Sequence, residues 1–153
     1  MIQLQYKLLS SRIKEATKSK EGRVLVVDDD AAMRTILLSV LGKDFNVVAK
    51  RNGLEAMLWL SEGNIPDVII SDIMMPQLNG YDFIKNLRQS GIYSTIPVLV
   101  LSGHDAENIE EESLKIGADH YLSKPFDPKI VLDYALKAYL RSKFKRKSPL
   151  VHN

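Results

Sequence analysis

The sequence contains no cysteine, so this chain can form neither disulfides nor thiolate metal sites. It has no apolar run approaching the roughly 18 residues that a membrane span requires. Its first twenty residues also lack the continuous apolar core of a signal peptide. The net charge of +2 is too small to indicate nucleic-acid binding by itself. These absences favour a cytoplasmic protein.

The length of 153 residues, with 45% hydrophobic and 26% charged residues, predicts one globular domain with short extensions. We expect a basic amphipathic extension over residues 1–22, the domain over 23–142 and a basic tail over 143–153. Apolar residues in the extension recur at helical spacing, at Ile2, Tyr6, Leu9, Ile13 and Ala16. This stripe predicts a short helix docked on the domain, a frayed tail, or a helix that dimerises or binds a partner.

From residue 23 onward, short apolar runs alternate with segments of helical periodicity. The predicted strands are 23–28, 45–49, the run 68–70 leading to Asp72, 96–101 and 118–122; the predicted helices are 31–42, 54–60, 80–88, 106–116 and 127–144. Five such strand–helix units predict an α/β fold, with a doubly wound five-stranded parallel sheet and helices on both faces.

Four of the predicted strands end on polar side chains. Asp28 and Asp29 follow the first strand and Asp72 follows the third, while the fourth and fifth lead to Ser102 and Lys124. Because the carboxyl ends of parallel strands meet at one edge of a sheet, we expect these side chains to converge there.

Three carboxylates crowded at one edge repel one another unless one is protonated or a cation lies between them. Oxygen ligands without histidine or cysteine favour a hard cation, and Mg²⁺ is the expected cofactor. A metal ion beside a free carboxylate is suited to receiving a phosphoryl group, because it offsets the repulsion between two anions. Lys124 and Ser102 could contact further oxygens of that group.

These motifs, taken together, resemble those of the response-regulator receiver domain of two-component signalling. The resemblance spans about Gly22 to Ser142 and rests on VLVVDDD, DVIISDIMMPQLNG, PVLVLSG and YLSKPF, in the order that the family has. It implies a flavodoxin-like fold with strand order 2-1-3-4-5.

The resemblance also implies roles for individual residues. Asp72 would accept phosphate from a histidine kinase or a histidine phosphotransfer protein. Mg²⁺ would be held by Asp28, Asp29, Asp72 and the backbone carbonyl of Met74. Ser102 and Tyr121 would move on phosphorylation, and a cis peptide would precede Pro125. His104 could line the mouth of the site or lie exposed in a loop.

The predicted output surface comprises the helix at 106–116, the strand at 118–122 and the helix at 127–144. Ile130, Tyr134 and His120 make it more apolar than in receivers that dimerise to bind DNA. We therefore expect a downstream protein partner, no direct DNA binding and a possible homodimer. Only eleven residues follow Ser142, which is too few for an effector domain, so we expect either a single-domain regulator or a receiver cut from a larger regulator or hybrid kinase. The N-terminal helix and the presence of Met1 favour the single-domain regulator.

Two other functions compete with this one. A phosphatase similar to the haloacid dehalogenase superfamily would use Asp28 as nucleophile and Asp30 as acid/base, but would leave Asp72 idle. A receiver used only as a binding scaffold would not be phosphorylated at all. The complete set of acids favours the phosphoacceptor switch, which is not a classic enzyme.

Overall fold

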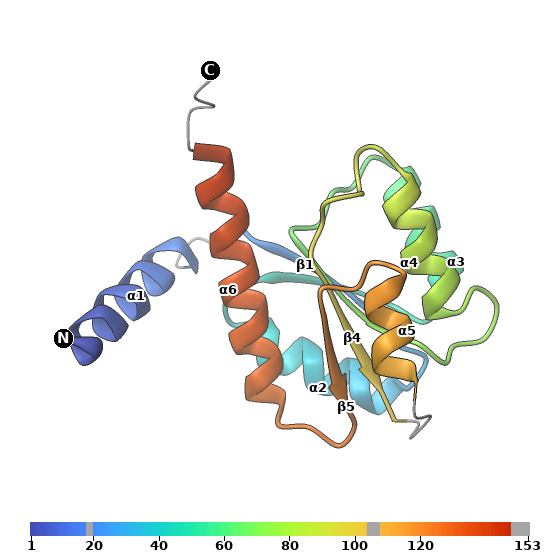
Figure 1. Ribbon diagram of the computed structural model, residues 1–153, viewed down its shortest axis with the longest axis horizontal. Helices are drawn as coiled ribbons and strands as arrows, with labels where there is room; N and C mark the ends of the chain where they lie inside the picture. Colours follow the sequence, from blue (N-terminus) through green and yellow to red (C-terminus); the bar gives the residue numbers. More distant parts are fainter. Residues whose placement is uncertain (18–19, 104–107, 148–153) are drawn as a thin grey trace.

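The computed structural model describes residues 1–17, 20–103 and 108–147 (Figure 1). It confirms the predicted α/β fold: five parallel strands form one sheet in the order β2-β1-β3-β4-β5. The strands are β1 (Arg23–Val27), β2 (Asn46–Lys50), β3 (Val68–Asp72), β4 (Val98–Ser102) and β5 (His120–Ser123). The helices are α1 (Ile2–Thr17), α2 (Ala31–Leu41), α3 (Gly53–Ser61), α4 (Gly80–Gln89), α5 (Ile109–Lys115) and α6 (Pro128–Lys147).

The two faces of the sheet carry separate hydrophobic cores, because successive side chains of a strand point to opposite faces. Leu25 and Ile69 pack on one face with Phe83 of α4 and residues of α3 and α5. Val26 and Ile70 pack on the other face with residues of α2 and α6. Strands covered on both sides consist of continuous apolar runs, which is why these runs were recognisable in the sequence.

Side-chain caps fix where the helices begin. Asp30 accepts a hydrogen bond from the Ala32 amide at the start of α2, at 2.9 Å. Asn52 and Asn79 accept equivalent bonds at the starts of α3 and α4. Each cap pairs an amide that the first helical turn leaves without a partner. The strand-end loops therefore lead into the helices at defined positions.

Most helix boundaries lie within one residue of the predicted ones, but the end of α6 and the start of α5 do not. Helix α6 continues to Lys147 instead of ending near Phe144, because Lys and Arg favour helix and no glycine or proline interrupts the chain before Pro149. Helix α5 begins at Ile109. Its predicted start at Ala106, like His104, lies outside the described residues.

Helix α1 forms as predicted, and the apolar side chains in its first half are exposed. Ile2 is 84% exposed and Tyr6 72% exposed, and Leu4, on the other side of the helix, is 64% exposed. The helix lies beside α6 and extends away from the sheet (Figure 1). Residues 2–9 of α1 are therefore exposed, and the role of this extension stays a prediction. No helix in the described part of the chain is long and apolar enough to cross a bilayer.

Gly80 allows the first turn of α4 to pass close to the end of β3. A Cβ at this position would overlap the Asp72 carbonyl oxygen and lie 2.7 Å from the Ile73 Cα. We expect Gly80→Ala to lower the free energy of unfolding by about 1–3 kcal/mol in urea denaturation, because backbone atoms cannot move aside cheaply. Gly91→Ala is the matched control, since nothing lies within 4 Å of its Cβ position. Equal effects of the two substitutions would contradict this packing argument.

Candidate phosphoacceptor site

Three carboxylates converge at the carboxyl edge of the sheet, as the strand ends predicted. Ligand oxygens of Asp28, Asp29 and Asp72 all lie within 4.8 Å of one another. Asp28 and Asp72 are buried, at 1% and 7% exposure, whereas Asp29 is exposed. The adjacent strands β1 and β3 bring them together, because Val27 pairs with Ser71 immediately before the acids.

Lys124, directly after β5, joins the two buried acids. Its Nζ lies 3.1 Å from Asp28 Oδ2 and 3.3 Å from Asp72 Oδ2. Burial by itself would lower the pKa of Lys124, but the negative charges of Asp72 and Asp28 outweigh burial and raise it. The ammonium therefore stays charged and offsets part of the repulsion between the carboxylates.

Backbone amides orient the same two carboxylates. The Asp30 amide donates to Asp28 Oδ1 at 2.9 Å, and the Ile73 amide donates to Asp72 Oδ1 at 2.7 Å. Each acid thus has one oxygen held by the backbone and the other held by Lys124. The Asp30 carboxylate is exposed and caps α2, which does not suit the acid/base role of the phosphatase hypothesis.

The pKa of Asp72 is raised. Burial is the largest cause and the charge of Asp28 adds to it, while Lys124 and the Ile73 amide compensate only in part. The ionised form of Asp72 is therefore less favourable in the folded protein than in the unfolded chain.

The remaining predicted site residues surround this cluster. Ser102 is fully buried at the end of β4, and its carbonyl accepts from the Lys124 amide at 2.7 Å. The peptide bond between Lys124 and Pro125 is cis, the isomer that the resemblance implies. Tyr121 is partly buried against the core beside α5, and Met74 is 54% exposed in the loop after β3.

Arg34 is part of this edge and was not identified from the sequence. Its Nη1 donates to the Asp28 carbonyl at 2.8 Å and so ties α2 to the loop after β1. An arginine one turn into a helix is usually solvated, so no sequence signal distinguishes this one. Only the direction of its long side chain in the folded structure reveals the contact.

The donor set fits a magnesium ion. Three carboxylates supply the oxygen ligands that Mg²⁺ prefers, and they can be completed by water. Among the described residues, no hydrogen bond or ion pair occupies the Asp29 carboxylate, so its oxygens are available for coordination.

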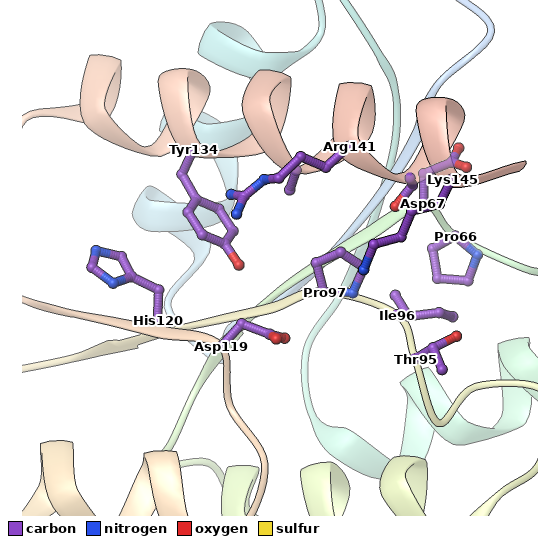
Figure 2. Close-up of a pocket in the computed structure, with 12 residues that line it drawn as sticks. Pro66, Asp67, Thr95, Ile96, Pro97, Asp119, His120, Tyr134, Arg141 and Lys145 are labelled. Atoms are coloured by element: carbon purple, nitrogen blue, oxygen red, sulfur yellow. The ribbon is translucent and has the colours of Figure 1, made fainter. Parts of the chain in front are cut away.

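A second concave region lies at the opposite, amino-terminal edge of the sheet. This cleft of about 710 Å³ is bounded by the starts of β3, β4 and β5 and by the outer half of α6 (Figure 2). His120 stacks on Tyr134 at one end of it, with ring centroids 5.6 Å apart. Arg141 and Lys145 line it from α6. None of the predicted site residues borders this cleft.

Comparison with known proteins assigns the family. The family model of the response regulator receiver domain matches residues 24–135. The chain therefore belongs to the response regulator receiver domains of two-component signalling, a family of phosphoacceptor switches.

Individual relatives agree with this assignment. The chain is 36% identical over 148 residues to a probable transcriptional regulatory protein of Picosynechococcus, covering 92% of this chain and 58% of that one. It is 34% identical to histidine kinase P4 of Formosa agariphila, covering 74% of this chain and 8% of that one. The structure of the Francisella response regulator 1452 receiver domain matches with a TM-score of 0.72 and 33% identity, over 80% and 99% of the two chains. The chain spans about half the length of most curated relatives that it matches.

The raised pKa of Asp72 has a measurable consequence for stability. The protonated form of Asp72 favours the folded state. Its contribution to the free energy of unfolding is fully present below pH 3.8, the pKa of an unperturbed aspartate, and is lost as the pH rises through the higher pKa of Asp72 in the folded protein. We therefore expect Asp72→Asn to be more stable than wild type at pH 7 in EDTA, and the difference to vanish at low pH. Urea denaturation across this range tests it. Equal stability of Asp72→Asn and wild type at pH 7 in EDTA would contradict this expectation.

Proposed function

We propose that the chain is a phosphoacceptor switch in which Asp72 receives a phosphoryl group from a phosphohistidine of a kinase or phosphotransfer protein. The observation that carries this proposal is the buried pair Asp28 and Asp72 joined by Lys124, with the exposed Asp29 beside them. A buried nucleophile with a cation already at its oxygen is suited to a reaction between two anions.

In the proposed reaction, a carboxylate oxygen of Asp72 attacks phosphorus. A P–O bond forms as the P–N bond of the phosphohistidine breaks, and the imidazole nitrogen keeps the electron pair and takes up a proton. Lys124 stabilises the negative charge on the phosphoryl oxygens. Asp28, Asp29, Asp72 and the Met74 carbonyl would hold Mg²⁺, which supplies further charge stabilisation when bound.

Ser102 and Tyr121 would connect the site to the surface formed by α5, β5 and α6. Ser102 lies at the end of β4 beside Ser123 of β5, and Tyr121 is on β5 next to α5. A phosphoryl group on Asp72 would attract the Ser102 hydroxyl and favour a rearranged state of this surface. The output would then be a contact with a downstream protein, at a face where His120 stacks on Tyr134.

Incubation with acetyl phosphate and Mg²⁺ should add one acid-labile phosphoryl group, located on Asp72 by mass spectrometry. Asp72→Asn should abolish the labelling, because the nucleophile is removed. Asp30→Asn should retain it, because Asp30 only caps α2. Labelling lost in Asp30→Asn and kept in Asp72→Asn would support the phosphatase hypothesis instead, and absence of labelling in wild type would support the scaffold.

Magnesium binding can be measured without phosphorylation. We expect Mg²⁺ to raise the free energy of unfolding of wild type, by about 2.7 kcal/mol when its concentration is a hundred times the dissociation constant. The same titration in Asp29→Asn should show a much weaker effect, since a carboxylate ligand is lost. Asp30→Asn should respond like wild type, and equal loss in both variants would show that the ion binds elsewhere.

A further inference from the structure

Charge is strongly segregated along this nearly neutral chain. Residues 137–147 contain six Lys and Arg and no acid, and residues 1–20 contain five with one acid. Residues 21–136 between them contain ten basic and eighteen acidic residues. The net charge of +2 therefore conceals two basic segments and a central region of net charge −8.

The fold brings the two basic segments together. Residues 137–147 form the outer half of α6, and α1 contacts this helix (Figure 1). We define the basic pole as the described side chains of Lys7 and Arg12 on α1 and Lys137, Arg141, Lys143 and Lys145 on α6. Arg141 and Lys145 line the cleft at the amino-terminal edge of the sheet (Figure 2). The three acids lie at the opposite, carboxyl edge.

The cations at the cleft are not neutralised by the fold. Among the described residues, no carboxylate pairs with Arg141 or Lys145, although Asp119 and Asp67 line the same cleft. Asp119 Oδ2 already accepts hydrogen bonds from Arg88 Nη2, at 3.0 Å, and from the Val98 amide. Two other members of the basic pole are in ion pairs, Lys137 with Asp133 at 2.9 Å and Lys143 with Glu21 at 2.7 Å. Arg141 and Lys145 are therefore the cations of the pole that are available to an external anion at the cleft.

Large apolar side chains are exposed at the same pole. Phe144 lies between Lys143 and Lys145 in the sequence and is 57% exposed. The first half of α1 exposes Leu4 and Leu8 together with Ile2 and Tyr6. A nucleic-acid backbone would contact the cations but would leave these side chains in water. An anionic bilayer accepts both, because apolar side chains enter the acyl boundary while lysines contact the headgroups.

We propose that the basic pole binds peripherally to a membrane surface rich in anionic phospholipid, with α1 lying along it. The carboxyl edge of the sheet, with Asp28 and Asp72, then faces away from the lipid and remains open to a phosphodonor. This inference is independent of the proposed phosphorylation, and Asp72→Asn should bind the same vesicles equally well.

Co-sedimentation of the full chain with vesicles tests this proposal. We expect binding to phosphatidylcholine vesicles that contain phosphatidylglycerol, weakened by salt, and little binding to phosphatidylcholine alone. Arg141→Gln/Lys145→Gln should weaken binding by about thirtyfold, because each cation near such a surface contributes about a fivefold factor. Leu4→Ser/Leu8→Ser should also weaken it, since less apolar surface enters the lipid.

The matched control is Lys85→Gln/Lys129→Gln, which removes the same charge from exposed positions on α4 and in the first turn of α6. It should bind nearly as wild type does. Equal weakening by both charge variants would overturn the proposal, as would binding to duplex DNA in preference to vesicles. It would also be overturned if Leu4→Ser/Leu8→Ser altered only self-association and left vesicle binding unchanged.

Discussion

The structure depends on one electrostatic arrangement: two buried carboxylates on neighbouring strands share a single lysine ammonium. The carboxylates of Asp28 and Asp72 repel each other at this distance, and this repulsion adds to the cost of removing both groups from water. Lys124 reaches both through Oδ2, while backbone amides hold both Oδ1 atoms. The neutralisation is incomplete, as the raised pKa of Asp72 indicates. Because Lys124 offsets only part of the negative charge of the carboxylates, the site favours binding of a further cation.

The parallel sheet makes this arrangement possible. Its central strands β1, β3 and β4 are buried on both faces, so the charged side chains of these strands lie at the strand ends. Short capped connections at the carboxyl edge hold the acids in place, and Gly80 allows α4 to begin directly against the end of β3. The backbone around the site therefore helps to position the acids, together with their contacts to Lys124.

The amino-terminal edge of the sheet is basic, whereas the carboxyl edge is acidic. At the amino-terminal edge, α6 extends past the sheet with a row of lysines and arginines, and α1 lies beside it with the apolar side chains of its first half exposed. An acidic centre at one edge and a basic, partly apolar surface at the other allow the molecule to contact a phosphodonor and an anionic surface at the same time. The two surfaces share no residue, so changes at one need not alter the other.

The sequence predicted the order of strands and helices and the burial of the strands, because both follow from periodicity. It also predicted that Asp28, Asp72, Ser102 and Lys124 lie at one edge, because the carboxyl ends of parallel strands meet there. Tertiary structure alone decided that Lys124 contacts both acids, that Arg34 turns back to the Asp28 carbonyl and that the first half of α1 stays exposed. Each of these depends on side-chain directions and on contacts between distant segments, such as the 96 residues that separate Asp28 from Lys124. Local sequence patterns do not encode such contacts.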